Sequence, residues 1–451
     1  MKRIAFSLCI FLSGFCMQAQ TTNFPTAAVD SILKQIKLPV IPGFTVNVTT
    51  FGAKGDSVTN CKPAFDKAMA NCKKHKGGTI IVPPGNYTLN GPIHFVSNVK
   101  LELQAGAKIR FSDNPEHYLP MVLTSWEGTM LYNYSPLIYA YECHDIAITG
   151  EGTIDGVGNK IWDSFKDKEE ADKMLSREMN HTQVPINKRL FGKNHFLRPQ
   201  FIQFFNCKNI LVENIRIENS PFWCLHLLKS ESATVRGVKY LALNHNNDGI
   251  DPEYAKNVLI ENISFNNGDD NIAIKAGRDH EGRANSSTPS ENIIIRNCRF
   301  KGLHGVVLGS EMSAGVKNVY IDNCKTSSYL KRGIYLKSNA DRGGFIRNIY
   351  VRNLHLDEVE DCIYVTANYH GEGNDFPTEI TDLFFSDIAC NKVTETAIVL
   401  QGFAEKKIRN VHFENINILS AKNGLTITNS EKVEFSEVVI GKKATIPTSV
   451  K

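Results

Sequence analysis

Long apolar runs, paired cysteine motifs and an excess of one charge are all scarce in this 451-residue sequence. After residue 17, no stretch approaches the roughly 18–20 apolar residues that a bilayer span needs, so we expect no membrane span. The eleven cysteines contain no CxxC motif, which argues against a zinc site, and we expect neither a metal nor a cofactor. The 51 basic and 47 acidic residues are interspersed and leave a formal net charge of +4, which argues against a nucleic-acid partner.

The first twenty residues, MKRIAFSLCIFLSGFCMQAQ, combine two basic residues, an apolar run over 4–17 and a small or polar ending. This layout predicts a signal peptide over residues 1–19, cleaved near Ala19, and hence a secreted or periplasmic protein. Cleavage leaves a net charge of +2 and nine cysteines, an odd number that does not suit a disulfide framework. The alternatives are a buried helix and a lipid anchor on Cys16. Phe15 argues against the anchor, because a lipid-anchored cysteine is normally preceded by a small residue.

The rest of the sequence is organised by a repeat. Each unit is a β-branched alternation, an Asn or Gly turn and a second short alternation, and successive units start 24 to 35 residues apart over the regular part. This pattern predicts stacked coils of a parallel β-helix in an all-β, single-domain protein over residues 20–451. A leucine-rich-repeat solenoid is the rival, but the units contain no helix-forming half. Examples of the units are NILVENIRIENS at 209, NVLIENISFNNG at 257, NIIIRNCRFKG at 292 and NIYVRNLHLDE at 348.

Two segments depart from the repeat. Residues 63–77 have apolar residues at helical spacing and end in two glycines, which predicts a helix that caps the N-terminal end of the solenoid within a cap and first-coil region over 45–110. Residues 160–197 contain the charged helical stretch KDKEEADKMLSREMN, and we expect this insertion to form one wall of a binding groove. Three cysteines at turns of the repeat predict a buried cysteine ladder: Cys207, Cys298 and Cys324.

Carboxylates and cations recur at a spacing of about one coil. Residues one coil apart in a β-helix lie about 4.8 Å apart, as neighbouring strands do. Asp269 follows Asp248 by 21 residues, and His304 follows Asp270 by 34, a longer separation that includes the loop RDHEGRANSSTPS. A further 33 residues, with lengthened turns, lead to a lysine. We therefore expect four successive coils to present one group of side chains: Asn246, Asp248, Asp269, Asp270, His304 and Lys337.

This group suits the hydrolysis of a glycosidic bond. One protonated carboxyl can act as the acid while another carboxylate activates water, and a third carboxylate raises the pKa of the acid by repulsion. Lys337 would hold a carboxylate-bearing sugar as a point charge, and His304 would donate to or orient the groups around the bond. The group therefore predicts a hydrolase that acts on an acidic sugar.

With these residues, the chain resembles the polygalacturonase family, glycoside hydrolase family 28, whose members degrade pectin on a right-handed parallel β-helix. The resemblance covers nearly all of the mature chain, and it implies that Asp269 is the general acid and that Asp248 and Asp270 activate the water, with inversion at the anomeric carbon. The stretches IKAGRDHEGR, HGVVLGSE and RGIYLKSNADRGG look more like the bacterial, exo-acting branch. The four family motifs have counterparts at NND (246–248), GDD (268–270), HG (304–305) and YLK (335–337).

Two positions depart from the family pattern. Leu303 stands where the third motif begins with Gly, which affects only a turn. Tyr335 stands where the fourth motif has an arginine, and tyrosine cannot form the two parallel hydrogen bonds by which arginine binds a carboxylate. The leaving-group sugar is therefore neutral, differently linked or held by other residues, and rhamnogalacturonan is an alternative to homogalacturonan as substrate. The resemblance also implies substrate contacts for three further residues: Arg278, Arg283 and Tyr369.

We expect a monomer that binds a pectic oligo- or polysaccharide. One alternative is a pectate-lyase-like β-helix, in which clustered aspartates hold calcium and a basic residue abstracts a proton. It is disfavoured because the cluster offers His304 and Lys337 in place of an arginine base. The other alternative is a β-helix that binds glycans without catalysis and would tolerate the loss of Asp269.

Overall fold

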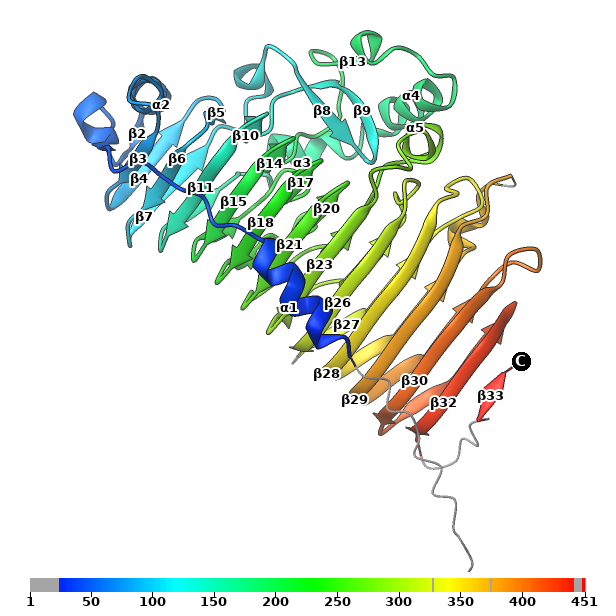
Figure 1. Ribbon diagram of the computed structural model, residues 1–451. Helices are drawn as coiled ribbons and strands as arrows, with labels where there is room; N and C mark the ends of the chain where they lie inside the picture. The colour runs from blue at the N-terminus through cyan, green and yellow to red at the C-terminus, as the bar shows by residue number, and fades with distance from the viewer. Residues whose placement is uncertain (1–23, 327, 374, 442–447, 451) are drawn as a thin grey trace, which may run out of the picture.

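The computed structural model describes residues 24–326, 328–373, 375–441 and 448–450, whose strands stack into one long solenoid (Figure 1). Among these residues, antiparallel pairing occurs only between β8 (Val122–Trp126) and β9 (Thr129–Asn133) and between β32 (Ser430–Ile440) and β33 (Ser449–Val450). All other pairs are parallel, so the fold is the parallel β-helix that the repeat predicts. No helix of the described residues has the length and apolar content to cross a bilayer. The predicted signal peptide, with Cys16 and Ala19, lies outside the described residues.

The strands form three columns along the stack. The first column contains β5 (Ile93–His94), β10 (Ile138–Tyr141), β14 (Ile202–Phe205), β17 (Leu225–Leu228), β20 (Ile250–Glu253), β22 (Asp270–Ile274), β25 (His304–Gly309), β27 (Tyr329–Lys337) and β31 (Ala421–Thr428). The second contains β1 (Thr45–Asn47), β3 (Gly78–Val82), β6 (Val99–Leu103), β11 (His144–Gly150), β15 (Lys208–Glu213), β18 (Glu231–Arg236), β21 (Lys256–Glu261), β23 (Ser290–Arg296), β26 (Val316–Thr326), β30 (Ile408–Ile418) and β32. The third contains β2 (Asp56–Asn60), β4 (Gly85–Leu89), β7 (Ala107–Phe111), β12 (Thr153–Asp155), β16 (Arg216–Glu218), β19 (Lys239–Leu241) and β24 (Arg299–Phe300). The long strands β28 (Phe345–Thr366) and β29 (Glu379–Gln401) bend and contribute to more than one column.

The core consists of side-chain ladders that run along the stack. In the first column, register pairing places one apolar residue of each coil directly above the next, and all of them are 0% exposed: Ile138, Ile202, Leu225, Ile250 and Ile272. The residue that follows each of them points away from the core, because successive side chains of a strand alternate between the two faces. The first column therefore presents a second, outward-facing ladder.

Asparagine forms the corners between columns. Asn292, Asn318 and Asn348 have φ values of 59°, 56° and 57°, a left-handed conformation that Asn tolerates better than most residues. Their side-chain amides also form a ladder along the stack. Asn318 Nδ2 donates to Asn292 Oδ1 at 3.1 Å, and Asn348 Nδ2 donates to Asn318 Oδ1 at 3.0 Å. The Asn turns of the repeat thus mark both a backbone conformation and a hydrogen-bond partner in the neighbouring coil.

The three cysteines that were predicted to form one ladder lie at two different places in the stack. All cysteines of the described residues are buried and free, and this includes the three that were predicted to be buried. Register pairing places Cys298 beside Cys324, but Cys207 lies beside Cys143. Cys207 precedes a strand of the second column, whereas Cys298 precedes a strand of the third column. The prediction of a single ladder is wrong because similar turn sequences occur at two different corners.

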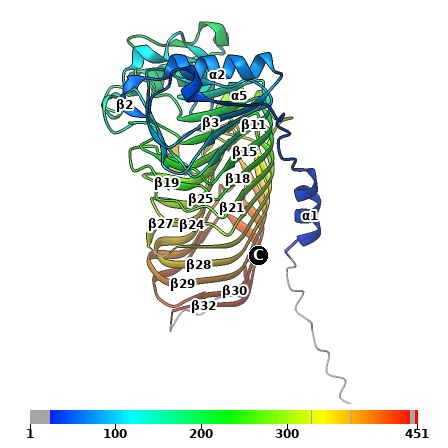
Figure 2. The same ribbon diagram turned by 90° about the vertical axis from the view of Figure 1, so that its left-hand side faces the viewer.

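Helices cover the N-terminal end and one outer face. The helix α2 (Lys62–Lys74) lies at the end of the stack, as predicted, and buries Phe65, Ala68 and Met69 beside β1, β3, β5 and η1 (Val48–Phe51). The helix α1 (Thr26–Gln35) was not predicted. Its Val29 and Ile32 pack on side chains of β21, β23 and β26 on the outside of the second column (Figure 2).

A group of irregular segments lies along the N-terminal half of the first column (Figure 1). The hairpin β8–β9 pairs with β13 (Leu190–Phe191) in a separate three-stranded sheet. The predicted insertion over 160–197 contains β13 and three helical segments, and α5 (Asp279–Ala284) lies beside α4. The remaining helical segments are α3 (Ile161–Phe165), α4 (Glu170–His181), η2 (Pro115–Tyr118), η3 (Ile186–Lys188) and η4 (Tyr369–Gly371).

Candidate active site

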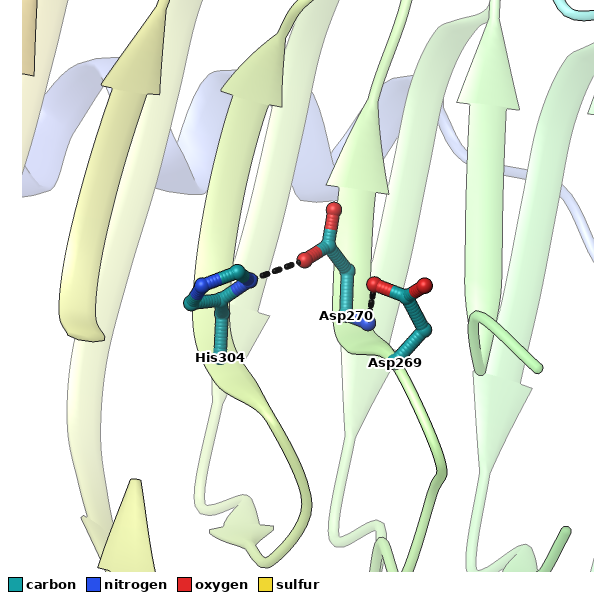
Figure 3. A group of neighbouring side chains, drawn as sticks. All are labelled: Asp269, Asp270 and His304. Atoms are coloured by element: carbon teal, nitrogen blue, oxygen red, sulfur yellow. Dashed lines mark hydrogen bonds and ion pairs between the residues drawn. The ribbon is translucent and has the colours of Figure 1, made fainter. Parts of the chain in front are cut away.

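Three neighbouring strands of the first column bring Asp270, His304 and Lys337 together. Asp270 begins β22 and pairs in register with His304 at the start of β25, while Lys337 ends β27. One oxygen of Asp270 lies 2.6 Å from His304 Nδ1, and the other accepts a hydrogen bond from Lys337 Nζ at 3.2 Å. Asp269 lies on the same turn, where its Oδ1 accepts the backbone N–H of Asp270 at 3.0 Å (Figure 3). The structure thus joins four residues from three separate stretches of sequence.

The two adjacent aspartates are shifted in opposite directions. Burial, and then the neighbouring charge of Asp270, raise the pKa of Asp269. Burial also opposes ionisation of Asp270, but the charge of Lys337 and the contact with His304 outweigh it and hold the pKa of Asp270 well below its usual range. Neighbouring carboxyls whose pKa values are pushed apart can serve as an acid and a base at one pH.

Lys275 is the central cation of a second, buried group next to these aspartates. Its Nζ lies 3.5 Å from Asp248 Oδ2, 3.6 Å from Asp251 Oδ1 and 3.5 Å from Glu311 Oε2. Burial raises the pKa of Asp248 well above its usual value and raises that of Asp251 to about 8, while Lys275 acts against both shifts. The negative charges of Asp251 and Asp269 add to the upward pKa shift of Asp248. Glu311, by contrast, is also paired with Arg278. Sequence reasoning did not identify Lys275, although a lone lysine in the apolar strand NIAIKA was a signal.

Asn246 is held by an arginine that sequence reasoning also missed. Arg198 is 0% exposed, and its Nη2 donates to Asn246 Oδ1 at 2.7 Å. The same guanidinium donates to the backbone oxygen of His245 at 2.8 Å and pairs with Glu169 at 3.1 Å. Glu169 belongs to the segment 160–197, so this insertion fixes the turn that leads into Asp248.

Arg278 and Arg283, for which the resemblance implied substrate contact, are engaged by protein groups. Arg278 is 3% exposed, and its Nη2 donates to Glu311 at 3.1 Å. Its backbone N–H donates to a carbonyl in the turn of the β8–β9 hairpin at 3.1 Å. Arg283 stacks 3.7 Å from the centre of the Phe376 ring and donates to the backbone oxygen of Asp341. Arg278 is therefore linked to the acidic group through Glu311, while Arg283 contacts a loop of a later coil.

Aromatic side chains form the floor beyond the carboxylates. Tyr335 is 4% exposed and packs with Tyr364 and Tyr369, with ring centres 5.4 Å and 6.3 Å away. Burial raises the pKa of Tyr335 to about 12, so its hydroxyl stays neutral. Lys337 Nζ lies 5.3 Å from the centre of the Tyr335 ring and 5.5 Å from that of Tyr369. The structure thus brings Tyr335, Tyr369 and Lys337 together at this end of the site.

Asp269, Asp270 and His304 are also the one group of the described residues whose ligand atoms lie close enough, within 4.8 Å of one another, to hold a metal ion. Calcium prefers six to eight oxygen ligands, whereas this group offers two carboxylates and one imidazole nitrogen. The Lys337 ammonium lies 3.2 Å from Asp270 and would repel a divalent cation there. This donor set does not fit the calcium site that the lyase-like alternative requires.

The groove is covered on the side of the earlier coils. The outward-facing Gln203, His226 and Glu253 are 0% exposed because the hairpin β8–β9 lies over them. Thr124 donates to Gln203 at 2.9 Å, and Ser125 donates to Glu253 at 3.2 Å. His226 completes the network, with Nε2 at 2.8 Å from Glu253 and Nδ1 at 3.0 Å from Gln203 Nε2. Each of these buried polar side chains therefore has a partner, as burial requires.

The side of the later coils is open. A pocket of about 330 Å³ begins at His304 and continues past Tyr364 to Gln401. Tyr364 and Gln401 are half-buried, and Asn368 at the rim is exposed. The carboxylates thus lie where a covered half of the groove meets an open half.

The sequence matches the model of glycosyl hydrolases family 28 over residues 72–438. The chain belongs to glycosyl hydrolases family 28. It is 28% identical to the endo-polygalacturonase of Pectobacterium carotovorum subsp. carotovorum, over 81% of this chain and 86% of that protein. It is 26% identical to the exo-poly-alpha-D-galacturonosidase of Dickeya chrysanthemi, over 87% of this chain and 70% of that protein. The crystal structure of a hyperthermoactive exopolygalacturonase from Thermotoga maritima superposes with a TM-score of 0.88 at 35% identity, covering 92% of this chain and 96% of that one.

Membership of family 28 confirms the resemblance inferred from the sequence motifs. It makes the chain a glycoside hydrolase.

Proposed function

We propose that this family 28 hydrolase removes galacturonate from the ends of pectic chains by cleaving α-galacturonosyl bonds with inversion. The position of Asp269 and Asp270 at the junction of the covered and open halves carries this proposal. A polymer can extend only toward the later coils, because the β8–β9 hairpin fills the other direction. The bond next to the chain end is then the one that meets the acid. The similarity to the Thermotoga maritima exopolygalacturonase supports the same mode.

In the proposed reaction, Asp269 donates its proton to the glycosidic oxygen as the bond to the anomeric carbon breaks. Its raised pKa keeps that proton available. Asp270, held ionised by Lys337, takes a proton from a water whose oxygen attacks the opposite face of the anomeric carbon. Asp248 orients this water beside Asp270. Hydrolysis thus consumes one water and leaves Asp269 ionised and Asp270 protonated, and proton exchange with solvent restores both groups.

His304 and Lys337 contribute to positioning in this proposal. His304 Nε2 is buried and has no hydrogen-bond partner among the described residues, so it is available to a sugar hydroxyl. Lys337 and the side-chain amide of Asn246 complete the polar lining, with Lys337 as a point charge for a carboxylate of the substrate. These contacts require an acidic sugar at the bond that is cleaved.

Digestion of homogalacturonan tests the function. We expect galacturonate as the only product at the earliest times, with little loss of viscosity, whereas oligosaccharides of mixed length would contradict the exo mode. Proton NMR of the first product should show the β-anomer, and an α-anomer would indicate a covalent intermediate. Ultraviolet absorbance of an unsaturated sugar, abolished by a chelator, would establish a lyase instead. Binding without any turnover would establish a glycan-binding protein.

We also propose that the protein is exported and cleaved near Ala19, on the basis of the N-terminal sequence. Mass spectrometry of the mature protein tests this proposal. A mature chain that begins near residue 20 supports it, and an intact or acylated N-terminus contradicts it.

A further inference from the structure

Arg332 is a cation on the open side of the groove that the proposed reaction does not use. It lies in β27, in register with His304 of the preceding strand and with Asp361 of the following one. Its side chain is 15% exposed and lines the same pocket as His304 and Tyr364. The sequence motifs did not identify it, because Arg332 lies three residues before the YLK motif.

Its neighbours hold the Arg332 guanidinium in a fixed orientation. The central carbon lies 4.4 Å from the centre of the Tyr335 ring and 4.2 Å from that of Tyr364, so the guanidinium contacts both rings. Its Nε lies 3.2 Å from Asp361 Oδ2, and Asp361 Oδ1 accepts the backbone N–H of Thr396 at 3.1 Å. Asp361 is therefore anchored in turn by the next coil, and the arginine does not have to be ordered when a ligand binds.

The outer edge of this guanidinium is available to a ligand. Within the described part of the chain, no residue accepts a hydrogen bond from Nη1 or Nη2 of Arg332, although its pocket is only partly open to solvent. A planar pair of N–H donors matches the two oxygens of a carboxylate, with which arginine forms two parallel hydrogen bonds. The ligand chemistry that fits this position is therefore a carboxylate on a sugar that also contacts the aromatic floor.

We propose that Arg332 binds the carboxylate of the uronate on the leaving-group side of the scissile bond. This inference rests on the proposed exo mode, in which the sugar that is released occupies the covered end and the remaining chain leaves toward the pocket. His304 marks the start of the pocket and contacts Asp270 at 2.6 Å, so the first sugar beyond the bond reaches the neighbourhood of Arg332.

This assignment explains how the site binds an acidic leaving group although residue 335 is a tyrosine. The Tyr335 ring faces the Arg332 guanidinium, so the cation comes from three residues earlier in the same strand. The substrate then does not need a neutral leaving-group sugar, and homogalacturonan is favoured over rhamnogalacturonan.

The test compares two substrates that share the sugar to be released and differ in the leaving group. Digalacturonate has a carboxylate on its leaving-group sugar, whereas an aryl α-galacturonide has none. We expect Arg332→Gln to lower kcat/KM for digalacturonate by about 10- to 100-fold, the effect of losing a charge-assisted pair of hydrogen bonds. For the aryl galacturonide we expect a change below about threefold, because that leaving group has no carboxylate to bind the guanidinium.

Arg352→Gln is a matched control. Arg352 also pairs with an aspartate, with Nη2 at 2.8 Å from Asp322, and it also stacks on a ring, at 3.9 Å from the centre of Phe24. It lies on the outer face of the second column, near α1, so we expect unchanged kinetics on both substrates. Arg332→Lys should recover only part of the loss, because lysine keeps the charge but not the fork of donors.

An equal loss on the two substrates would overturn the inference and would indicate that Arg332 only supports the floor. Unchanged kinetics on both would overturn it as well. If the wild-type protein hydrolyses neither substrate, the proposed function fails, and the inference is then decided by binding. Calorimetry with digalacturonate should show at least tenfold weaker binding to Arg332→Gln than to Arg352→Gln, and equal affinities would contradict a carboxylate site at Arg332.

Discussion

The outward-facing positions of the first column are fully buried on the earlier coils and only partly buried on the later coils. On the earlier coils, Gln203 and His226 are 0% exposed and form a hydrogen-bonded network beneath the β8–β9 hairpin. On the later coils, Tyr364 is half-buried and Thr426 is exposed. Both halves are built on one ladder of register-paired strands. The coils therefore supply a long surface, and the segments inserted between them decide how much of it a substrate can use.

The largest expected effect lies at the junction of the two halves. Asp269→Asn should lower kcat on a pectic substrate by about 10²- to 10⁴-fold, because it removes the proton that the leaving group needs. Single-turnover kinetics on digalacturonate measures this loss, and circular dichroism should show an unchanged fold. Asp322→Asn is the matched control, since it removes a carboxylate from the outer face of the second column. Near-wild-type turnover of Asp269→Asn would exclude it as the general acid.

The pH dependence of the free energy of unfolding should report the titration of Asp251, which is buried at the covered end of the site. The pKa of Asp251 is about 8 in the folded protein, compared with about 4 for an unfolded aspartate. Between these values the folded state binds more protons than the unfolded state, so the free energy of unfolding falls as the pH rises from about 4 to about 8. Each pKa unit of such a shift corresponds to about 1.4 kcal/mol, so this contribution amounts to several kcal/mol for a fully buried group.

Asp251→Asn tests this origin, because the amide cannot take up a proton. The melting temperature of the variant should fall less steeply than that of the wild type between pH 4 and pH 8. Thermal unfolding followed by circular dichroism at several pH values measures the two slopes. Equal slopes would show that other carboxyls are responsible for the pH dependence.

A smaller effect should separate buried from open polar positions on the outward face of the first column. Gln203→Ala should lower the free energy of unfolding by about 1–3 kcal/mol, because it leaves His226 without the amide that contacts its Nδ1. Gln401→Ala removes the same side chain from the open half, where Gln401 is half-buried and accepts a hydrogen bond from Thr366 at 2.9 Å. We expect a loss of about 0.5 kcal/mol or less there. Denaturant unfolding measures both values, and equal losses would contradict the difference between the halves.

Much of the candidate site could be inferred because a solenoid relates distance in sequence to distance in space. The separation of about one coil between Asp270 and His304 becomes a register pair and a contact of 2.6 Å. Lys275 and Arg332 were missed for a different reason. Lys275 directly follows the apolar strand β22, and Arg332 lies in β27 near aromatic residues. Nothing in the local sequence shows that Lys275 meets three carboxylates or that Arg332 contacts two tyrosine rings.

The parallel β-helix and the stacking of the carboxylates could be predicted from the sequence alone, because both follow from a periodicity that recurs in successive coils. The capping helix could be predicted from its own helical spacing of apolar residues and the two glycines that follow it. Two contacts could not be predicted from the sequence: α1 packs on the outside of the second column, and the β8–β9 hairpin covers Gln203 and His226. The fold also places Cys207 and Cys298 at different corners of the coil. The physical reason is that these contacts join segments of unlike sequence, where shape and hydrogen-bond partners rather than a repeat determine which surfaces meet.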